Sequence, residues 1–270
     1  MNFIIALEAE AKPLIDALKL KKVPGPLPFP TFQNKNHQLV VSGIGKVASA
    51  GATGFLLGKS PSQDRPSSFL NLGIAGHRSL DIGSLFIADR IFLEDCSSTY
   101  YPPQIIDSGI VRSPLQTCDR PNTDYERESG YDMEAHGFYT IASKSVTREL
   151  VQVVKVVSDN LRQPLNTFNP KIVSKVIDKN LPVILGFVES LEMLANEIFP
   201  DSETVAFKKE ALLSQNFTET QTHLLFQLLN QSKSFKIEEA KILQSLRNEN
   251  NAKSSLNSLA LLIEPYRILS

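Results

Sequence analysis

Residues 151–159 read Val-Gln-Val-Val-Lys-Val-Val-Ser-Asp, and this stretch decides the fold. The run from Val151 to Val157 is typical of a strand that is buried on both faces of a sheet. A shorter apolar run, Phe69-Leu70-Asn71-Leu72, ends at Gly73 and has the same character. Helix-like stretches such as Glu8 to Leu20 lie between runs of this kind. The alternation predicts an α/β domain whose sheet carries helices on both sides.

The chain changes character after Asp159. Ile172 to Ile198 is predicted to be helical, with an interruption near Pro182. Pro200-Asp201 is a candidate boundary, and residues 201–270 are predicted to be mainly helical. We therefore expect an α/β domain at 1–200 and a helical C-terminal extension at 201–270. The extension is interpreted either as a subdomain packed on the first domain or as a partner-binding or regulatory element.

The composition excludes several classes of protein. The 270 residues include 28 basic and 29 acidic side chains, so no basic surface for nucleic acid is expected. No apolar run approaches the roughly 20 residues that cross a bilayer, so no membrane association is expected. Glu8 and Glu10 follow the first apolar segment at once, which argues against a signal peptide and for a cytoplasmic protein.

Metal and cofactor sites are not expected either. The two cysteines make no disulfide framework. The four histidines lie at no ligand spacing with one another or with a cysteine. Ser42-Gly43-Ile44-Gly45-Lys46 lacks the spacing of a phosphate-binding P-loop and is interpreted as a turn from strand to helix. We therefore predict neither a metal nor a cofactor.

Residues 71–76, Asn-Leu-Gly-Ile-Ala-Gly, form a glycine-containing turn after a strand. Ligands of open α/β sheets bind at the carboxyl ends of strands, where glycines let a backbone approach closely. Gly73, Ala75 and Gly76 are therefore candidate substrate-binding residues. The alternative is a tight connection without a ligand.

Asp132-Met133-Glu134 is a second candidate. A carboxylate such as Glu134 can accept hydrogen bonds from both hydroxyls of a ribose, and Met133 can pack on the apolar face of the sugar. The alternative is a solvated helix start, where acidic residues suit the positive end of the helix dipole.

Two further carboxyl groups follow strands. Asp159, after Ser158, can hold a proton in a partly dry crevice and donate it to a leaving base. Glu10, shortly after the first strand, can enter the same crevice and activate water. The alternatives are an aspartate that caps a turn and a glutamate that favours a helix start.

Taken in order, these motifs resemble the nucleoside phosphorylase/nucleosidase superfamily. The closest pattern is that of the methylthioadenosine/S-adenosylhomocysteine nucleosidases and related bacterial phosphorylase-like proteins. The correspondence spans about residues 3–198. Its segments are Ile-Ile-Ala-Leu-Glu-Ala-Glu at 4–10, Ser-Gly-Ile-Gly-Lys-Val at 42–47, Asn-Leu-Gly-Ile-Ala-Gly at 71–76, Asp-Met-Glu-Ala at 132–135 and Val-Val-Ser-Asp at 156–159.

The resemblance implies a three-layer α/β/α fold around a twisted mixed sheet. It implies that Asp159 is the general acid at the base and that Glu10 activates water. It also implies that Glu134 binds the ribose hydroxyls and that Met133 packs on the ribose. Ser158 and the glycine turn complete the substrate site, and Arg112 lies near the place of the base-stacking aromatic. Tyr125 or Tyr131 is a possible substitute for that aromatic side chain.

The resemblance also bears on the nucleophile. Phosphorylases of this superfamily place arginines where this chain has Asn71 and the acidic segment at 8–10. We therefore predict hydrolysis of a nucleoside, of purine type, by a homo-oligomer. One alternative is phosphorolysis, with phosphate bound by Arg78, Arg112 or Arg120. Another is a non-catalytic nucleoside-binding or regulatory module.

Overall fold

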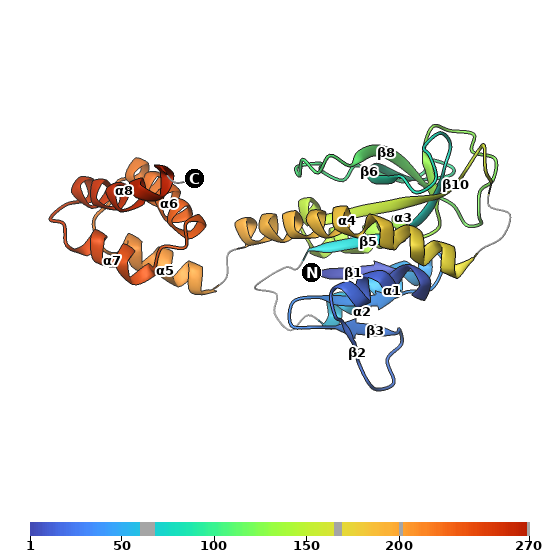
Figure 1. Ribbon diagram of the computed structural model, residues 1–270, viewed down its shortest axis with the longest axis horizontal. Coiled ribbons are helices and arrows are strands. Elements are labelled where there is room, and N and C mark those ends of the chain that lie inside the picture. The colour runs from blue at the N-terminus through green and yellow to red at the C-terminus, as the bar shows by residue number, and fades with distance from the viewer. Residues whose placement is uncertain (60–67, 165–168, 200–201, 269–270) are drawn as a thin grey trace. The chain divides into compact units, whose positions relative to one another are not determined.

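The computed structural model describes residues 1–59, 68–164, 169–199 and 202–268. They form two compact units, Met1–Phe199 and Pro200–Ser270, which we call the α/β unit and the helical unit (Figure 1). The boundary predicted at Pro200-Asp201 lies outside the described residues. The assignment of 1–200 and 201–270 as separate domains therefore stays a prediction.

Parallel strands form the centre of the α/β unit. β1 (Asn2–Ile5) pairs with β4 (Gln38–Val41) on one side and with β5 (Phe69–His77) on the other. β5 also pairs in parallel with β10 (Val151–Asn160). Nine of the ten residues of β10 are buried, as the valine-rich run predicts.

The remaining strands make the sheet mixed and curl part of it. β10 runs antiparallel to β6 (Leu85–Leu93), and β6 runs parallel to β8 (Val111–Thr117). β8 pairs with β9 (Gly130–Asp132), which pairs back to β5, so these five strands form a closed circuit. Short strands β2 (Lys21–Lys22) and β3 (Thr31–Gln33) extend the sheet beyond β4, and β7 (Thr99–Tyr100) pairs with β6.

Two pairs of helices cover the sheet, as Figure 1 shows. α1 (Glu8–Ala17) packs with α4 (Pro170–Ile198), and α2 (Lys46–Lys59) packs with α3 (Ala135–Ser145). A short 3₁₀ turn, η1 (Arg148–Leu150), leads into β10. The predicted α/β/α arrangement around a mixed sheet is confirmed.

The predicted interruption near Pro182 is wrong, because α4 continues through this proline. A proline inside a helix removes one backbone hydrogen bond and normally kinks or ends the helix. Here buried side chains lie on both sides of Pro182, including Ile177 before it and Phe187 after it. Packing on the core therefore holds the two halves in one helix.

The helical unit contains α5 (Ser202–Leu212), α6 (Glu219–Ser234), α7 (Glu239–Arg247) and α8 (Ala252–Ile268). It has an apolar core of its own, to which α6 contributes Leu225, Leu228 and Leu229. The Thr218 hydroxyl accepts a hydrogen bond from the Gln221 N–H and so caps the start of α6. Across both units, no described helix is long and apolar enough to cross a membrane.

Candidate active site

A cavity of about 270 Å³ lies at the carboxyl ends of the parallel strands of the α/β unit. Strand ends meet at one edge of such a sheet, so residues far apart in sequence come together there. We call it the acidic cavity, and its lining residues are Ala6, Leu7, Glu10, Ile44, Ile74, Ala75, Gly76, Arg120, Pro121, Asn122, Thr123, Tyr131, Asp132, Met133, Glu134, Ser158 and Asp159.

Glu10 is held by the backbone on both sides of its carboxylate. Its Oε2 accepts the Leu7 N–H at 2.9 Å, and its Oε1 accepts the Ile74 N–H at 2.8 Å. The side chain is 3% exposed, and this burial raises its pKa from 4.5 to about 7. A carboxyl group with such a pKa can take up a proton from a reacting group near neutral pH.

Glu134 lies at the N-terminal end of α3, on the opposite side of the sheet from α1. Its Oε1 accepts the Gly45 N–H at 2.8 Å, and its Oε2 accepts the Met133 N–H at 3.3 Å. Burial and the neighbouring Asp132 carboxylate raise the pKa of Glu134.

A buried ion pair lies behind these carboxylates. Lys155 Nζ lies 2.9 Å from Asp132 Oδ2, and both side chains are almost fully buried. Burial opposes the charge on Lys155, but Asp132, Glu134 and Glu10 together raise its pKa. The Thr117 hydroxyl donates to Asp132 Oδ1 at 2.7 Å. Asp132 therefore has its own cation and donor, which leaves Glu134 and Glu10 without a directly paired cation among the described residues.

Asp159 has hydroxyl partners instead of a cation. Ser158 Oγ donates to its Oδ1, and the phenol of Tyr125 donates to its Oδ2. Asp159 is 6% exposed. Donors to both oxygens hold the plane of the carboxyl group fixed relative to the cavity.

A β-bulge at the end of β10 places Ser158 and Asp159. Val157 lies opposite Ala75 of β5, whereas Asp159 lies opposite the next residue of β5, Gly76. Over this stretch β10 therefore contains one residue more than β5. Successive side chains of a regular strand point to opposite faces, and a bulge redirects them. Ser158 and Asp159 consequently both line the acidic cavity.

The glycines of the 71–76 segment make room for the carboxylates. A Cβ added at Gly73 would lie 2.8 Å from Glu10 Oε1, and one at Gly76 would lie 2.8 Å from Asp159 Oδ2. Only a residue without a side chain lets these carboxyl groups approach the strand so closely. Gly76 is therefore part of the cavity wall, and Gly73 lies against the carboxylate of Glu10.

The structure brings most of the predicted site residues together. Those that line the acidic cavity are Glu10, Ala75, Gly76, Met133, Glu134, Ser158 and Asp159. Gly73 lies against Glu10 without lining the cavity.

Arg112 is the predicted residue that the structure does not bring to the cavity. It is exposed on β8, where it pairs with Ile87 of β6. β8 pairs with neither β5 nor β10, because β6 and β9 lie between them in the sheet circuit, and Arg112 is not among the residues that line the cavity. The residues found in its place are Arg120, Pro121, Asn122 and Thr123, from the loop between β8 and β9, together with the ring of Tyr131.

One further residue, Lys155, left a signal in the sequence. Lys155 interrupts an otherwise apolar run, and a lysine inside a buried strand needs an anionic partner. Tyr125 lies in an irregular loop with no periodic pattern, so only the structure reveals its contact with Asp159.

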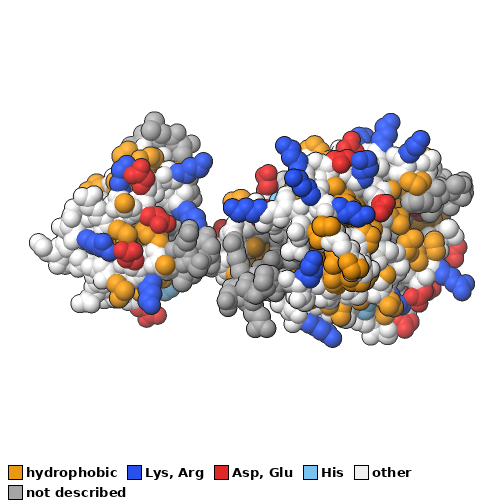
Figure 2. Space-filling view, turned by 90° about the horizontal axis from the view of Figure 1, so that it is seen from below, with side chains coloured by type: hydrophobic (Ala, Val, Ile, Leu, Met, Phe, Trp, Pro, Cys, Tyr) orange, Lys and Arg blue, Asp and Glu red, His pale blue; other side chains and the backbone are white. Residues whose placement is uncertain are grey.

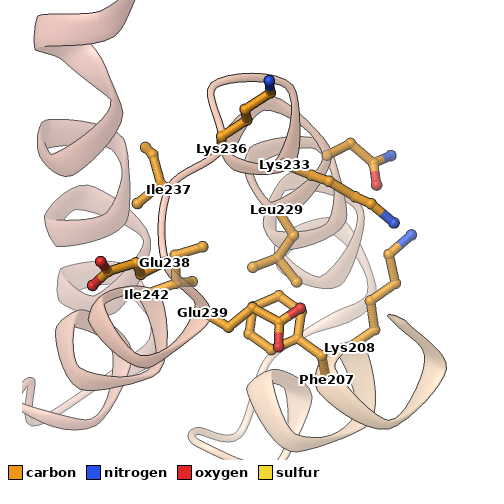
Figure 3. Close-up of a pocket in the computed structure, with 10 residues that line it drawn as sticks. Phe207, Lys208, Leu229, Lys233, Lys236, Ile237, Glu238, Glu239 and Ile242 are labelled. Atoms are coloured by element: carbon orange, nitrogen blue, oxygen red, sulfur yellow. The ribbon is translucent and has the colours of Figure 1, made fainter. Parts of the chain in front are cut away.

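A second cavity, of about 250 Å³, lies in the helical unit (Figure 3). Its buried lining residues, Leu229, Ile237 and Ile242, are all apolar. Lysine and glutamate side chains such as Lys236 and Glu239 lie on its rim, where they are exposed. The acidic cavity, by contrast, contains buried ionisable groups and is the better candidate for chemistry.

No protein-family model and no curated protein matches the sequence. Solved structures do match, and the nucleosidases among them share the fold of this chain. The Arabidopsis thaliana 5′-methylthioadenosine nucleosidase gives a TM-score of 0.59 at 16% identity, over 72% of this chain and 95% of that one.

Two bacterial structures give similar values. The Campylobacter jejuni 5′-methylthioadenosine/S-adenosylhomocysteine nucleosidase has a TM-score of 0.58 at 17% identity, over 70% of this chain and 98% of that one. The futalosine hydrolase of Helicobacter pylori has a TM-score of 0.56 at 17% identity, over 70% and 97%. At these identities the similarity shows a shared fold, and part of this chain has no counterpart in the matched structures.

Proposed function

We propose that the α/β unit hydrolyses the N-glycosidic bond of a nucleoside, of purine type. The observation that carries the proposal is the convergence of Glu10, Glu134 and Asp159 on one cavity. These carboxyl groups come from three separate segments, and each is fixed by hydrogen bonds. The shared fold with nucleosidases supports the same reading.

Glu10 is proposed to activate water. Its burial favours the neutral form, so a water molecule that lies beside the carboxylate can transfer a proton to it as the oxygen attacks C1′. The backbone N–H groups of Leu7 and Ile74 keep the carboxylate aimed at the cavity during this step.

Glu134 and Met133 are proposed to bind the ribose. The two oxygens of Glu134 can accept hydrogen bonds from the two ribose hydroxyls, and the Met133 side chain in the cavity wall can pack on the sugar. A carboxylate at the ribose also favours the positive charge that develops on the sugar as the bond breaks.

Asp159 is proposed to act as general acid. Its proton passes to a ring nitrogen of the base, and the electron pair of the C–N bond leaves with the base. Gly76 and Ala75 form the wall against which the base lies, and Tyr131 provides an aromatic surface near it. Ser158 orients the acid through its hydroxyl.

Water is favoured over phosphate as the nucleophile. Arg120 is the one Lys or Arg among the lining residues of the acidic cavity, and it is exposed. Asn71 is buried in the sheet, where its amide donates to the Ile4 carbonyl at 2.9 Å. An anionic phosphate would meet mainly carboxylates at the Glu10 end, which is unfavourable. Phosphorolysis with Arg120 as phosphate ligand is the second candidate.

A chromatographic assay on the full-length protein tests the proposal. The panel contains adenosine, inosine, 5′-methylthioadenosine, S-adenosylhomocysteine and futalosine, each with and without phosphate. We expect release of a free base without phosphate, and loss of this release in Glu10→Gln and Asp159→Asn. Glu8→Gln, an exposed change in the same helical turn, is the matched control and should retain activity.

Other outcomes distinguish the alternatives. Base release that depends on phosphate would contradict hydrolysis and support phosphorolysis. Nucleoside binding without turnover, unchanged in Asp159→Asn, would contradict catalysis and support a binding or regulatory module.

A homo-oligomer and a cytoplasmic location are part of the same proposal. Val47, at the start of α2, is 81% exposed, and Ile44 beside the cavity is 57% exposed. Figure 2 shows hydrophobic side chains gathered on one face of the α/β unit between Lys and Arg side chains. Apolar surface of this kind is common where copies associate. Light scattering after size-exclusion chromatography measures the oligomeric state.

A further inference from the structure

Tyr125 is a buried residue whose phenol contacts the candidate general acid, Asp159, and which does not line the acidic cavity. It lies in the loop between β8 and β9, is 0% exposed, and has a left-handed backbone with φ of 46°. Its phenol donates a hydrogen bond to Asp159 Oδ2. A non-glycine residue in this backbone region is held there by its surroundings, at a cost that indicates a specific role for the contact.

The loop is fastened on both sides of Tyr125. The Asn122 side chain accepts the Tyr125 N–H at 3.0 Å. Arg78 Nη1 donates to the Tyr125 carbonyl and, at 3.0 Å, to the Glu126 carbonyl. The ring also packs edge-on against Tyr131, with centroids 5.7 Å apart. These contacts leave the phenol little freedom to turn away from Asp159.

Gly76 creates the space for this contact. A Cβ at Gly76 would lie 3.0 Å from Tyr125 Cε1 as well as 2.8 Å from Asp159 Oδ2. The close approach of tyrosine, aspartate and strand therefore depends on the same glycine.

The two hydroxyl donors of Asp159 differ in their position. Ser158 lines the acidic cavity, whereas Tyr125 does not. A ligand that enters the cavity can displace the Ser158 hydroxyl from Oδ1, because serine rotates freely about one bond. It cannot reach the Tyr125 hydroxyl on Oδ2 without moving the loop. Oδ1 of Asp159 thus faces the ligand, and Oδ2 keeps its hydrogen bond from the Tyr125 phenol.

We propose that Tyr125 is a positioning residue for the proton transfer from Asp159. This inference rests on the proposed nucleoside cleavage. As the proton leaves Asp159 for the base, a carboxylate forms, and the Tyr125 O–H stabilises its negative charge. The phenol keeps its own proton throughout. Tyr125 also links the acid to the loop that carries Arg120 and Asn122 into the cavity.

Tyr125→Phe tests the inference, with the nucleoside that the wild type cleaves best as the substrate. A hydrogen bond to a charged group sets the expected drop in kcat at about 10- to 100-fold. KM should stay within about twofold, because a residue outside the cavity acts on the transition state and not on substrate binding.

Tyr139→Phe is the matched control. Tyr139 is 1% exposed on α3, does not line the cavity, and its hydroxyl has no hydrogen-bond partner among the described residues. It should keep wild-type kcat and wild-type KM. Melting temperatures of both variants show whether either change acts through stability.

The outcomes separate the inference from the proposed function. A Tyr125→Phe protein with wild-type kcat, or equal losses of kcat in both variants, would overturn the role of Tyr125 and leave nucleoside cleavage standing. A wild type that releases base from none of the nucleosides would overturn both.

Discussion

Replacing Glu10 by Gln should stabilise the protein in a strongly pH-dependent way. Burial raises the pKa of Glu10 from 4.5 to about 7. Below pH 4.5 the folded and unfolded chains both carry the proton. As the pH rises to about 7, the unfolded chain loses this proton first, so the free energy of unfolding of the wild type falls. Above about pH 7 the loss is complete, because the folded chain also ionises.

The size of the effect follows from the same rise in pKa. Each pH unit between the two pKa values contributes about 1.4 kcal/mol. The wild type therefore loses about 3 kcal/mol between pH 4.5 and pH 7, a loss that a neutral glutamine does not suffer. Gln has a single acceptor oxygen, so it gives up one of the two backbone hydrogen bonds from Leu7 and Ile74. That cost is about 1 kcal/mol and is the same at every pH.

Denaturant unfolding of the full-length chain at pH 5, 6, 7 and 8 measures the effect. The free energy of unfolding of Glu10→Gln, relative to the wild type, should rise with pH and level off above about pH 7. Glu8→Gln, on the exposed side of the same turn, should give a nearly constant difference. A flat or falling curve for Glu10→Gln would show that the folded protein does not hold this carboxyl group in a proton-binding state.

Three further results are expected. kcat/KM of the wild type should fall about tenfold per pH unit below about pH 7, as Glu10 takes up a proton, and a pH–rate profile with no acid limb would contradict its role as base. Lys155→Met should lower the free energy of unfolding by about 3–5 kcal/mol, because its buried aspartate partner loses its cation; denaturant titration checks this. Gly76→Ala should lower kcat about 100-fold by displacing Asp159, whereas Gly54→Ala, whose added Cβ meets nothing within 4 Å, should keep wild-type kinetics.

The sequence could predict that the site residues meet, because they follow the carboxyl ends of parallel strands. Apolar runs at 3–7, 69–72 and 151–157 indicate parallel strands, and parallel strands place their carboxyl ends at one edge. Glu10, Gly76 and Asp159 follow those runs, so their meeting requires no knowledge of loop conformation.

The base side of the cavity could not be predicted in the same way. β8 went unpredicted because Pro114 and Arg112 interrupt its apolar pattern, and a proline within a run argues against a strand. The loop after β8 is fixed by side chain–backbone hydrogen bonds from Asn122 and Arg78, which follow no sequence period. The resemblance assigns Arg112 to the base side of the cavity, whereas the structure brings Arg120 there.

The continuous helix at Pro182 and the ion pair of Lys155 could not be predicted from either residue considered alone. The helix-breaking tendency of Pro182 is outweighed by the packing of the long apolar face of α4. The spacing of apolar residues in the sequence reveals this face but not how strongly its packing stabilises the helix. Lys155 lies in a run whose valines dominate the pattern, and its partner Asp132 lies on a different strand. In both cases a tertiary contact decides the outcome.

The extra residue near the end of β10 means that the direction of Asp159 depends on the length of the strand as well as on its sequence. Adding one residue to β5 opposite Ser158 would restore an even pairing and turn Asp159 toward the opposite face of the sheet, with every neighbouring side chain still present. A protein that differs by one residue at this point would keep the same sheet and lose the aspartate from the cavity. An alignment that tolerates a gap there would therefore group proteins with and without this aspartate in the cavity.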